Sequence, residues 1–110
     1  MRLAIVGSRD ISFVELEKYL PDGITEIVSG GARGIDCIAA NYAKEHGILL
    51  TEFLPDYACY GKVAPLKRNE KIANYADEAL AFWDGCSRGT EHVIRMFRQR
   101  GKHVSVILVL

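Results

Sequence analysis

The sequence predicts a single three-layer α/β domain over residues 1–110, in which helices cover both faces of a parallel sheet of about five strands. Short apolar segments alternate along the chain with segments of helical periodicity. Glycine-containing turns follow several apolar segments, and the most glycine-rich turn opens directly into a helical pattern. With 110 residues, 49% of them hydrophobic, the chain has enough apolar material for one core.

The first elements follow from local patterns. Residues 3–6 form a continuous apolar run, which is typical of a strand buried on both faces of a parallel sheet. Ser12 and Glu15 have the spacing of a capping box, which predicts a helix over residues 13–20. We expect a second strand over residues 24–28, leading into the glycine-rich turn.

The rest of the chain continues the alternation of helices and strands. We expect a helix from 35 to a terminal Gly47, a strand over 48–53, an irregular flap over 56–64, a helix over 65–76, a strand over 80–83, a loop over 84–90, a helix ending near Arg100 and a strand over 104–110. Right-handed crossovers between these strands give a Rossmann-like, doubly wound sheet.

A glycine-rich segment, Ser29–Gly34, joins the second strand to its helix. Glycine permits positive φ angles and close approach of a phosphate, and the helix that follows presents backbone N–H groups and a positive dipole end. We therefore expect these N–H groups to bind phosphate or a nucleotide. The alternative is that the glycines only form a tight turn between strand and helix.

Three loops are predicted to meet at one edge of the sheet, after the first, second and fourth strands. Ligands of such sheets bind at the carboxyl ends of the strands, near the point where the strand order reverses. The candidate ligand-binding residues are Gly7, Ser8, Arg9, Ser29, Gly30, Gly31, Ala32, Arg33, Gly34, Asp36, Arg68, Asn69, Asp84, Gly85, Ser87, Gly89 and Thr90.

Several candidates have a structural alternative. Asn69 lies on the apolar stripe of its helix, where it either satisfies loop backbone groups or contacts ligand. Arg68 is either an anion partner or a surface residue. Asp36 either caps its helix or binds a ribose hydroxyl or loop amide. Thr90 is either an N-cap or a phosphate ligand, and Trp83 either belongs to the core or stacks on a base.

The composition argues against several classes of protein. The 14 basic and 14 acidic residues give a net charge of zero, which disfavours binding to nucleic-acid backbone without excluding it. We accordingly interpret Arg98, Arg100 and Lys102 as a solvated helix terminus. No apolar run approaches the ~20 residues of a membrane span, and no secretory leader is evident.

Cysteine usage indicates a cytoplasmic protein with reduced thiols. The three cysteines have no CxxC spacing, and neither they nor the three histidines have metal-ligand spacing, so we predict no metal site. Cys37 is expected to be a small buried residue rather than a reactive thiol. A GxxxxGK[ST] motif and a GxGxxG turn after the first strand are both absent, which argues against a P-loop and an ordinary dinucleotide site.

The segment Ser-Gly-Gly-Ala-Arg-Gly-Ile-Asp resembles the signature of the SLOG superfamily. This group includes the Rossmann domain of DNA-processing protein A (Smf/DprA), the "lonely guy" phosphoribohydrolases and small bacterial YspA-like proteins. The other motifs of that family correspond in this chain to Gly7-Ser8-Arg9, Arg68-Asn69 and residues 85–90. The resemblance covers nearly the whole chain and is closest to the YspA-like branch. It implies binding of a nucleotide or an ADP-ribose-like molecule.

We therefore expect a small sensor or accessory domain that binds an AMP-, ADP-ribose- or NAD-like ligand and requires no cofactor. One alternative is a phosphoribohydrolase, for which Glu91, Asp36 and Asp84 are the candidate acids. The family's catalytic glutamate would fall three residues after Thr90, where this chain has Val93. A second alternative is single-stranded DNA binding through Arg9, Arg33, Arg68 and Arg88. The resemblance and the aromatic residues Tyr57, Tyr60 and Trp83 also suggest a homodimer.

Overall fold

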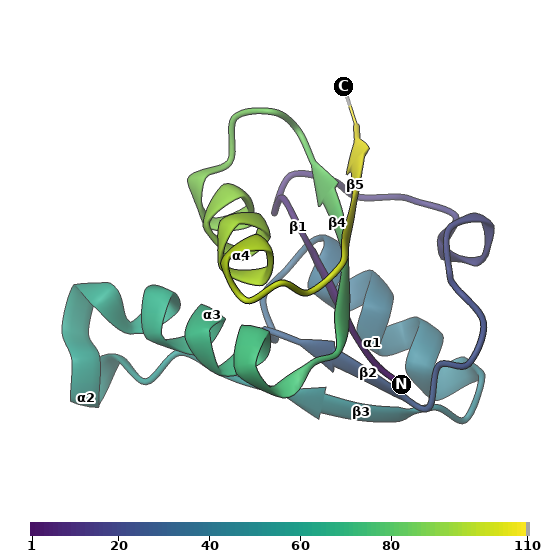
Figure 1. The fold of residues 1–110 in the computed structure, drawn as a ribbon, viewed down its shortest axis with the longest axis horizontal. Helices are drawn as coiled ribbons and strands as arrows, with labels where there is room; N and C mark the ends of the chain where they lie inside the picture. Colours follow the sequence, from purple (N-terminus) through teal and green to yellow (C-terminus); the bar gives the residue numbers. More distant parts are fainter. Residues whose placement is uncertain (110) are drawn as a thin grey trace.

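A computed structural model describes residues 1–109, which form an open, wholly parallel five-stranded sheet. The strands lie in the order β3-β2-β1-β4-β5 (Figure 1). Their bounds are β1 Arg2–Gly7, β2 Glu26–Ser29, β3 Leu49–Glu52, β4 Glu78–Trp83 and β5 Val104–Leu108. The predicted doubly wound α/β fold is confirmed. Of the last predicted strand, Leu110 lies outside the described residues.

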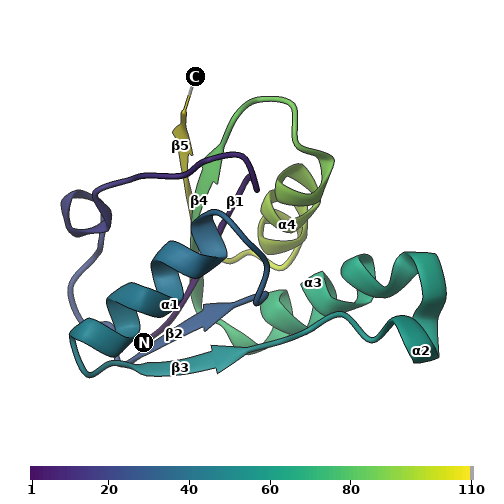
Figure 2. The same cartoon turned by 180° about the vertical axis from the view of Figure 1, so that it is seen from behind.

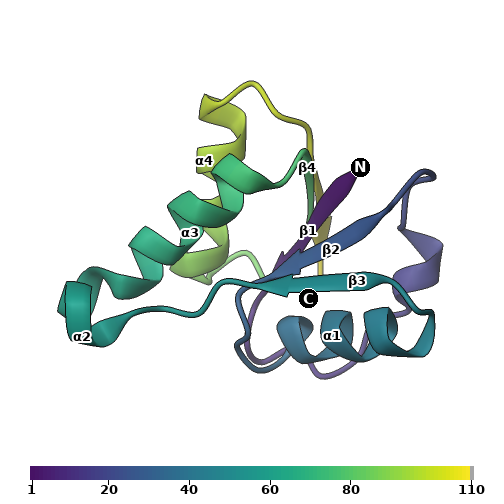
Figure 3. The same cartoon turned by 90° about the horizontal axis from the view of Figure 1, so that it is seen from below.

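Three α-helices of eleven or twelve residues cover the two faces of the sheet. Their bounds are α1 Ile35–Glu45, α3 Ala64–Tyr75 and α4 Arg88–Gln99. Helix α1 lies on one face and helices α3 and α4 lie on the other, so that the sheet forms the middle layer (Figures 2 and 3). None of the helices in residues 1–109 combines the length and the apolar composition that crossing a membrane requires.

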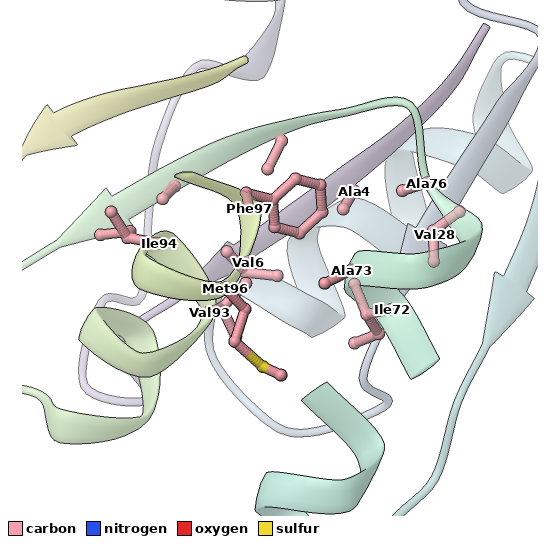
Figure 4. Packing of buried hydrophobic residues seen from close by; sticks show 12 residues of the cluster. Ala4, Val6, Val28, Ile72, Ala73, Ala76, Val93, Ile94, Met96 and Phe97 are labelled. Atoms are coloured by element: carbon pink, nitrogen blue, oxygen red, sulfur yellow. The ribbon is translucent and has the colours of Figure 1, made fainter. Parts of the chain in front are cut away.

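The two faces of the sheet have separate cores. On one face, Phe97 of α4 and Ile72 of α3 pack over Ala4 and Val28 (Figure 4). On the other face, Ile35 and other residues of α1 pack on the strands. Side chains of β1 alternate between the two cores, as the continuous apolar run predicts.

The predicted helix over residues 13–20 is wrong. Only a single 3₁₀ turn, η1 (Leu16–Lys18), forms there, and the Ser12 side chain caps nothing. Leu16 is 3% exposed but Phe13 is 74% exposed, so the segment has no continuous apolar stripe to bury against the sheet. Burial of such a stripe provides most of a short helix's stability, and the capping pattern alone does not replace it.

The segment over residues 56–64 also differs from prediction. Instead of an irregular flap it contains α2 (Tyr57–Tyr60) and η2 (Gly61–Val63), with the Asp56 carboxylate accepting a bond from the Cys59 N–H at 3.0 Å. These turns lead directly into α3 and extend away from the sheet (Figure 3). Tyr57 and Tyr60 are exposed there, at 56% and 38%.

Lys102 has a role that the sequence analysis misses. Its ammonium group donates hydrogen bonds to the carbonyl oxygens of Ala73, Asn74 and Ala76, at 2.7, 3.2 and 2.8 Å. The terminal carbonyls of a helix lack intrahelical partners, and a cation suits that end of its dipole. Lys102 therefore caps α3 from the turn before β5, and the interpretation of it as part of a solvated terminus of α4 is wrong.

Candidate functional site

A cleft of about 500 Å³ lies at the carboxyl ends of the central strands. The chain leaves β1 toward β2 on one side and later enters β4 on the other, so this edge is the switch point of the sheet. The predicted residues that line the cleft are Gly7, Ser8, Arg9, Gly30, Ala32, Arg33, Asp36, Arg68, Asn69, Asp84, Ser87, Gly89 and Thr90. The three predicted loops thus meet, as the sheet topology requires.

Four predicted residues lie outside this lining: Ser29, Gly31, Gly34 and Gly85. Gly31 lines an adjoining pocket of about 330 Å³ together with Pro55. The wall of the main cleft also includes apolar residues that the sequence analysis does not single out, namely Val6, Pro65, Leu66, Ile72 and Val93. Only Leu66 among them is an exposed side chain.

Contrary to the prediction of the sequence analysis, the glycine loop does not present all of its N–H groups to a phosphate. The Gly31 N–H donates to Ser29 Oγ at 3.3 Å, and the Ala32 N–H donates to Asp36 Oδ2 at 3.0 Å. These two amides are therefore occupied within the loop and are not free donors. Asp36 binds a loop amide, which was one of its two predicted roles.

Packing explains the glycines near α1. A Cβ on Gly7 would lie 2.4 Å from the Ile35 side chain, and one on Gly34 would lie 2.6 Å from the Arg9 carbonyl oxygen. Gly34 also has φ +75°, which L side chains rarely adopt. Gly89 differs, because nothing lies within 4 Å of its ideal Cβ position. Close packing thus requires Gly7 and Gly34, whereas Gly89 leaves open space beside the cleft.

Arg68 links α3 to the glycine loop. Its Nη1 donates to the Gly30 carbonyl oxygen at 2.8 Å, and its Nε donates to Asn69 Oδ1 at 2.9 Å. A Cβ on Gly30 would lie 2.5 Å from Arg68 Nη1 and 3.1 Å from Asp36 Oδ2, so only glycine leaves room for this arrangement. Arg68 is therefore not a free surface residue.

Burial sets the charge balance around Asp36. It raises the pKa of the Asp36 carboxyl, although the bond from the Ala32 N–H and the positive charge of Arg68 act in the opposite direction. Burial also lowers the pKa of Arg68, with the charge of Asp36 opposing the change. The opposite charges of Asp36 and Arg68 thus partly offset the cost of burying each of them at the base of the loop.

Asn69 is buried, at 4% exposed, and does not contact loop backbone as one alternative predicted. Its Oδ1 accepts from Arg68, and its Nδ2 lies 3.1 Å from Nδ1 of His92 on α4. His92 is a functional candidate that the sequence analysis missed. No local motif marks it, because the contact depends on how α3 packs against α4.

The third loop is held by Asp84. Its Oδ1 accepts the Cys86 N–H at 2.8 Å and the Ser87 N–H at 2.7 Å, and these two bonds lower the pKa of the carboxyl. Ser8 Oγ in turn accepts the Asp84 N–H at 3.3 Å. The carboxylate thus positions the N-terminus of α4 against β1.

Helix α4 begins earlier than predicted. Its N-cap is Ser87, whose hydroxyl lies 3.3 Å from that of Thr90, so Thr90 is buried in the first turn and is not the N-cap. Trp83 is partly buried and donates from Nε1 to the Ser87 carbonyl oxygen at 2.9 Å. Trp83 therefore stabilises the turn between β4 and α4.

Three exposed charged side chains line the cleft, those of Arg9, Asp10 and Arg33, so that two positive charges stand against one negative charge. Asp36 and Asp84 accept backbone N–H groups, as described above. Within residues 1–109, neither Arg9 nor Arg33 has a side-chain partner, and both line the cleft. In the same part of the chain, no group accepts from the N–H groups of Arg88, Gly89 and Thr90 in the first turn of α4.

Two other predicted candidates lie elsewhere. Glu91 is exposed and pairs with Arg95 at 3.2 Å, outside the lining of the cleft. Cys37 is exposed, which contradicts the expectation that it is buried, because this position in α1 faces away from the sheet.

Comparisons with known proteins agree with this architecture. A family model described as "YspA, cpYpsA-related SLOG family" matches residues 1–60, which include the first two loops of the cleft. The "Gene 61 protein" of Mycobacterium phage D29 is 40% identical over 115 aligned positions, covering 91% of this chain and 90% of the phage protein. No solved structure matches the chain.

Proposed function

The chain belongs to the YspA, cpYpsA-related SLOG family, and from this premise we propose that its cleft binds a nucleotide or a nucleotide-derived ligand of the AMP, ADP-ribose or NAD type. In this proposal the domain acts as a sensor or accessory of nucleotide metabolism. The observation that carries it is the cleft at the switch point, which has free arginine side chains and the start of a helix in its wall.

Charge supports an anionic ligand. Arg9 and Arg33 approach the cleft from two different loops, and a guanidinium group can bind phosphate oxygens in a bidentate manner. The amides of Arg88, Gly89 and Thr90 add donors that are neutral but lie at the positive end of a twelve-residue helix. Together these groups favour phosphate or diphosphate.

Shape supports an extended ligand with an uncharged part. The main cleft adjoins the smaller pocket, and both are lined by Gly30, Arg33 and Arg68. Apolar side chains such as Val93 and Ile72 form another part of the wall. A phosphate near the arginines would leave this apolar part for a base or ribose.

Thermal denaturation with a panel of AMP, ADP-ribose and NAD tests the proposal. Binding to the native state raises Tm in proportion to ln(1 + [L]/Kd), so at least one compound should raise the Tm at millimolar concentration. The Arg33→Gln variant, which removes a cleft charge that has no structural partner, should reduce that rise. A Tm that stays constant across the whole panel contradicts the proposal.

One observation favours a second candidate, an N-glycosidase acting on a nucleoside monophosphate. Asp36 lies in the cleft, and burial raises the pKa of its carboxyl, which is the direction that a general acid requires. Of the other two candidate acids, Glu91 pairs with Arg95 outside the lining of the cleft. The bonds from the Ser87 and Cys86 N–H groups lower the pKa of Asp84, which disfavours it as an acid. Release of free base from AMP that is lost in Asp36→Asn would establish this activity, whereas binding without base release leaves the sensor role.

A further inference from the structure

Three hydrogen bonds connect the glycine loop to α4 through α3. The Gly30 carbonyl oxygen accepts from Arg68 Nη1 at 2.8 Å, and Asn69 Oδ1 accepts from Arg68 Nε at 2.9 Å. The Asn69 amide nitrogen then lies 3.1 Å from His92 Nδ1. Asn69 is 4% exposed, so water does not readily replace a bond lost here.

The chemistry of the amide fixes the protonation state of His92. Arg68 can only donate, so the atom of Asn69 facing it must be the oxygen. The Asn69 nitrogen, which can only donate, therefore faces His92. His92 Nδ1 must accept, which requires a neutral imidazole with its proton on Nε2.

We propose that His92 is a positioning residue for Arg68, and that protonation of its imidazole uncouples Arg68 from Asn69 and loosens the Gly30 loop. Protonated Nδ1 is a donor and faces the Asn69 amide nitrogen, which is also a donor. Rotating the amide by half a turn would satisfy His92 but would turn the nitrogen toward the donor Nε of Arg68. The charged form of His92 and the Arg68–Asn69 bond therefore exclude one another.

The surroundings of His92 favour its neutral form. Burial lowers the pKa of the imidazole, and the positive charges of Arg95 on α4 and of Arg100, the C-cap residue of that helix, act in the same direction. Glu70 on α3 acts in the opposite direction. The strands beneath α4 contribute apolar residues such as Val6 and Ala81. The midpoint of the His92 titration therefore lies below the usual pKa of about 6.5.

NMR of the ligand-free protein tests directly whether protonation of His92 affects Arg68; we call the hydrogen bonds that join Gly30, Arg68, Asn69 and His92 the relay. We expect His92 in wild type to be the Nε2–H tautomer at pH 8, and the Arg68 Nε–H signal to be visible and protected from exchange. On lowering the pH to 5, this signal should shift or disappear with the same midpoint as the His92 ring protons. The signal is assigned to Arg68 Nε–H by its absence from the spectrum of the Arg68→Lys variant. An Arg68 Nε–H signal that stays unchanged from pH 8 to 5 overturns the proposal, whether or not His92 titrates.

Two substitutions separate positioning from packing. His92→Asn can keep a side-chain oxygen near the place of Nδ1 but cannot be protonated, so the Arg68 signal should be present and independent of pH. His92→Leu fills a similar volume without an acceptor, so Asn69 loses one of its two bonds and the signal should exchange faster with water at every pH, again without a pH-dependent step. Equal Arg68 signals in the two variants would overturn the proposal even if both lose some stability.

A ligand measurement, which rests on the proposed function, extends the test. ADP-ribose serves as the probe because its diphosphate does not titrate between pH 8 and 5. Its affinity for wild type should fall about tenfold over this range, the contribution of one charge-assisted hydrogen bond, and that for His92→Asn should stay constant. If neither wild type nor His92→Asn binds ADP-ribose, the result contradicts the proposed function and leaves the proposal for His92 to the NMR test. Binding by wild type that does not change with pH counts against the relay.

Discussion

Arg68 on α3 donates a 2.8 Å hydrogen bond from its guanidinium group to the carbonyl oxygen of Gly30 in the glycine loop. The two residues are 38 positions apart in the chain, so the bond ties two separate elements together at the edge of the cleft. It also explains why the Gly30 position has no side chain, since a Cβ would lie 2.5 Å from the guanidinium nitrogen. The geometry of the cleft therefore depends on this pair.

Arg68→Lys should disturb the cleft although it keeps the charge. An ammonium group lacks the planar fork that lets Arg68 reach Gly30 and Asn69 together. We expect a loss of about 1–2 kcal/mol of unfolding free energy and about tenfold weaker binding of ADP-ribose, measured by urea denaturation and calorimetry. Lys67→Gln, which alters only an exposed pair with Glu70, is the control. If Arg68→Lys binds ADP-ribose as tightly as wild type, the two hydrogen bonds of the guanidinium group to Gly30 and Asn69 are not needed for binding.

Two glycines should respond in opposite ways to alanine. Gly34→Ala forces a Cβ to 2.6 Å from the Arg9 backbone at a positive φ angle, and should cost about 2 kcal/mol or more of stability. Gly89→Ala meets nothing within 4 Å and lies within α4, so stability should stay constant or rise by about 0.5 kcal/mol. Urea denaturation of both variants measures the difference.

Gly89→Ala also tests where the ligand lies. Its methyl group would enter the open space beside the start of α4, where close approach of a phosphate is proposed. We expect weaker ADP-ribose binding by a protein that is at least as stable as wild type. If calorimetry gives unchanged affinity, the phosphate does not approach the backbone of Gly89.

Lys102→Met should destabilise the protein because three carbonyl oxygens at the end of α3 lose their partner. We expect a loss of about 1–3 kcal/mol in urea denaturation. Arg98→Met removes the same charge from an exposed position on α4 and should change stability by less than about 0.5 kcal/mol. Equal effects of the two substitutions would show that overall charge matters and that the cap does not.

Glu26 should make stability depend on pH in the acid range. Its carboxylate accepts hydrogen bonds from the Thr51 and Tyr75 hydroxyls, and these lower its pKa below 4.5. Because the unfolded chain binds this proton more readily, Glu26 contributes stability above about pH 4.5 that is lost as the pH falls through its folded pKa. Glu26→Gln should therefore flatten the acid limb of a Tm-against-pH curve. Glu45→Gln, at an exposed position, should leave that limb unchanged.

The sequence predicted the parts that depend on neighbouring residues. The apolar run of β1, the glycine loop before α1 and the terminal Gly47, which has φ +65°, each follow from local rules. Their meeting at one cleft follows from parallel topology. Bounds of single strands shifted by one or two residues, as for β2.

The errors share a physical cause, which is contact between elements distant in the chain. The Ser12 capping pattern was outweighed by the absence of an apolar stripe, and the start of α4 was set by Asp84 bonding two amides in the turn. The roles of His92 and Lys102 arise where α4 and the turn before β5 meet α3. No pattern within either segment records which helix it will face.

The most direct test of nucleotide binding in the cleft is amide chemical-shift mapping with ADP-ribose. We expect saturable shifts in the three loop segments that supply residues to the cleft, which are 7–9, 30–33 and 87–90. The groove between residues 13–17 and α1, about 550 Å³ in volume, provides the internal comparison. Saturable shifts confined to that groove, or no saturable shifts at millimolar ligand, would contradict the account.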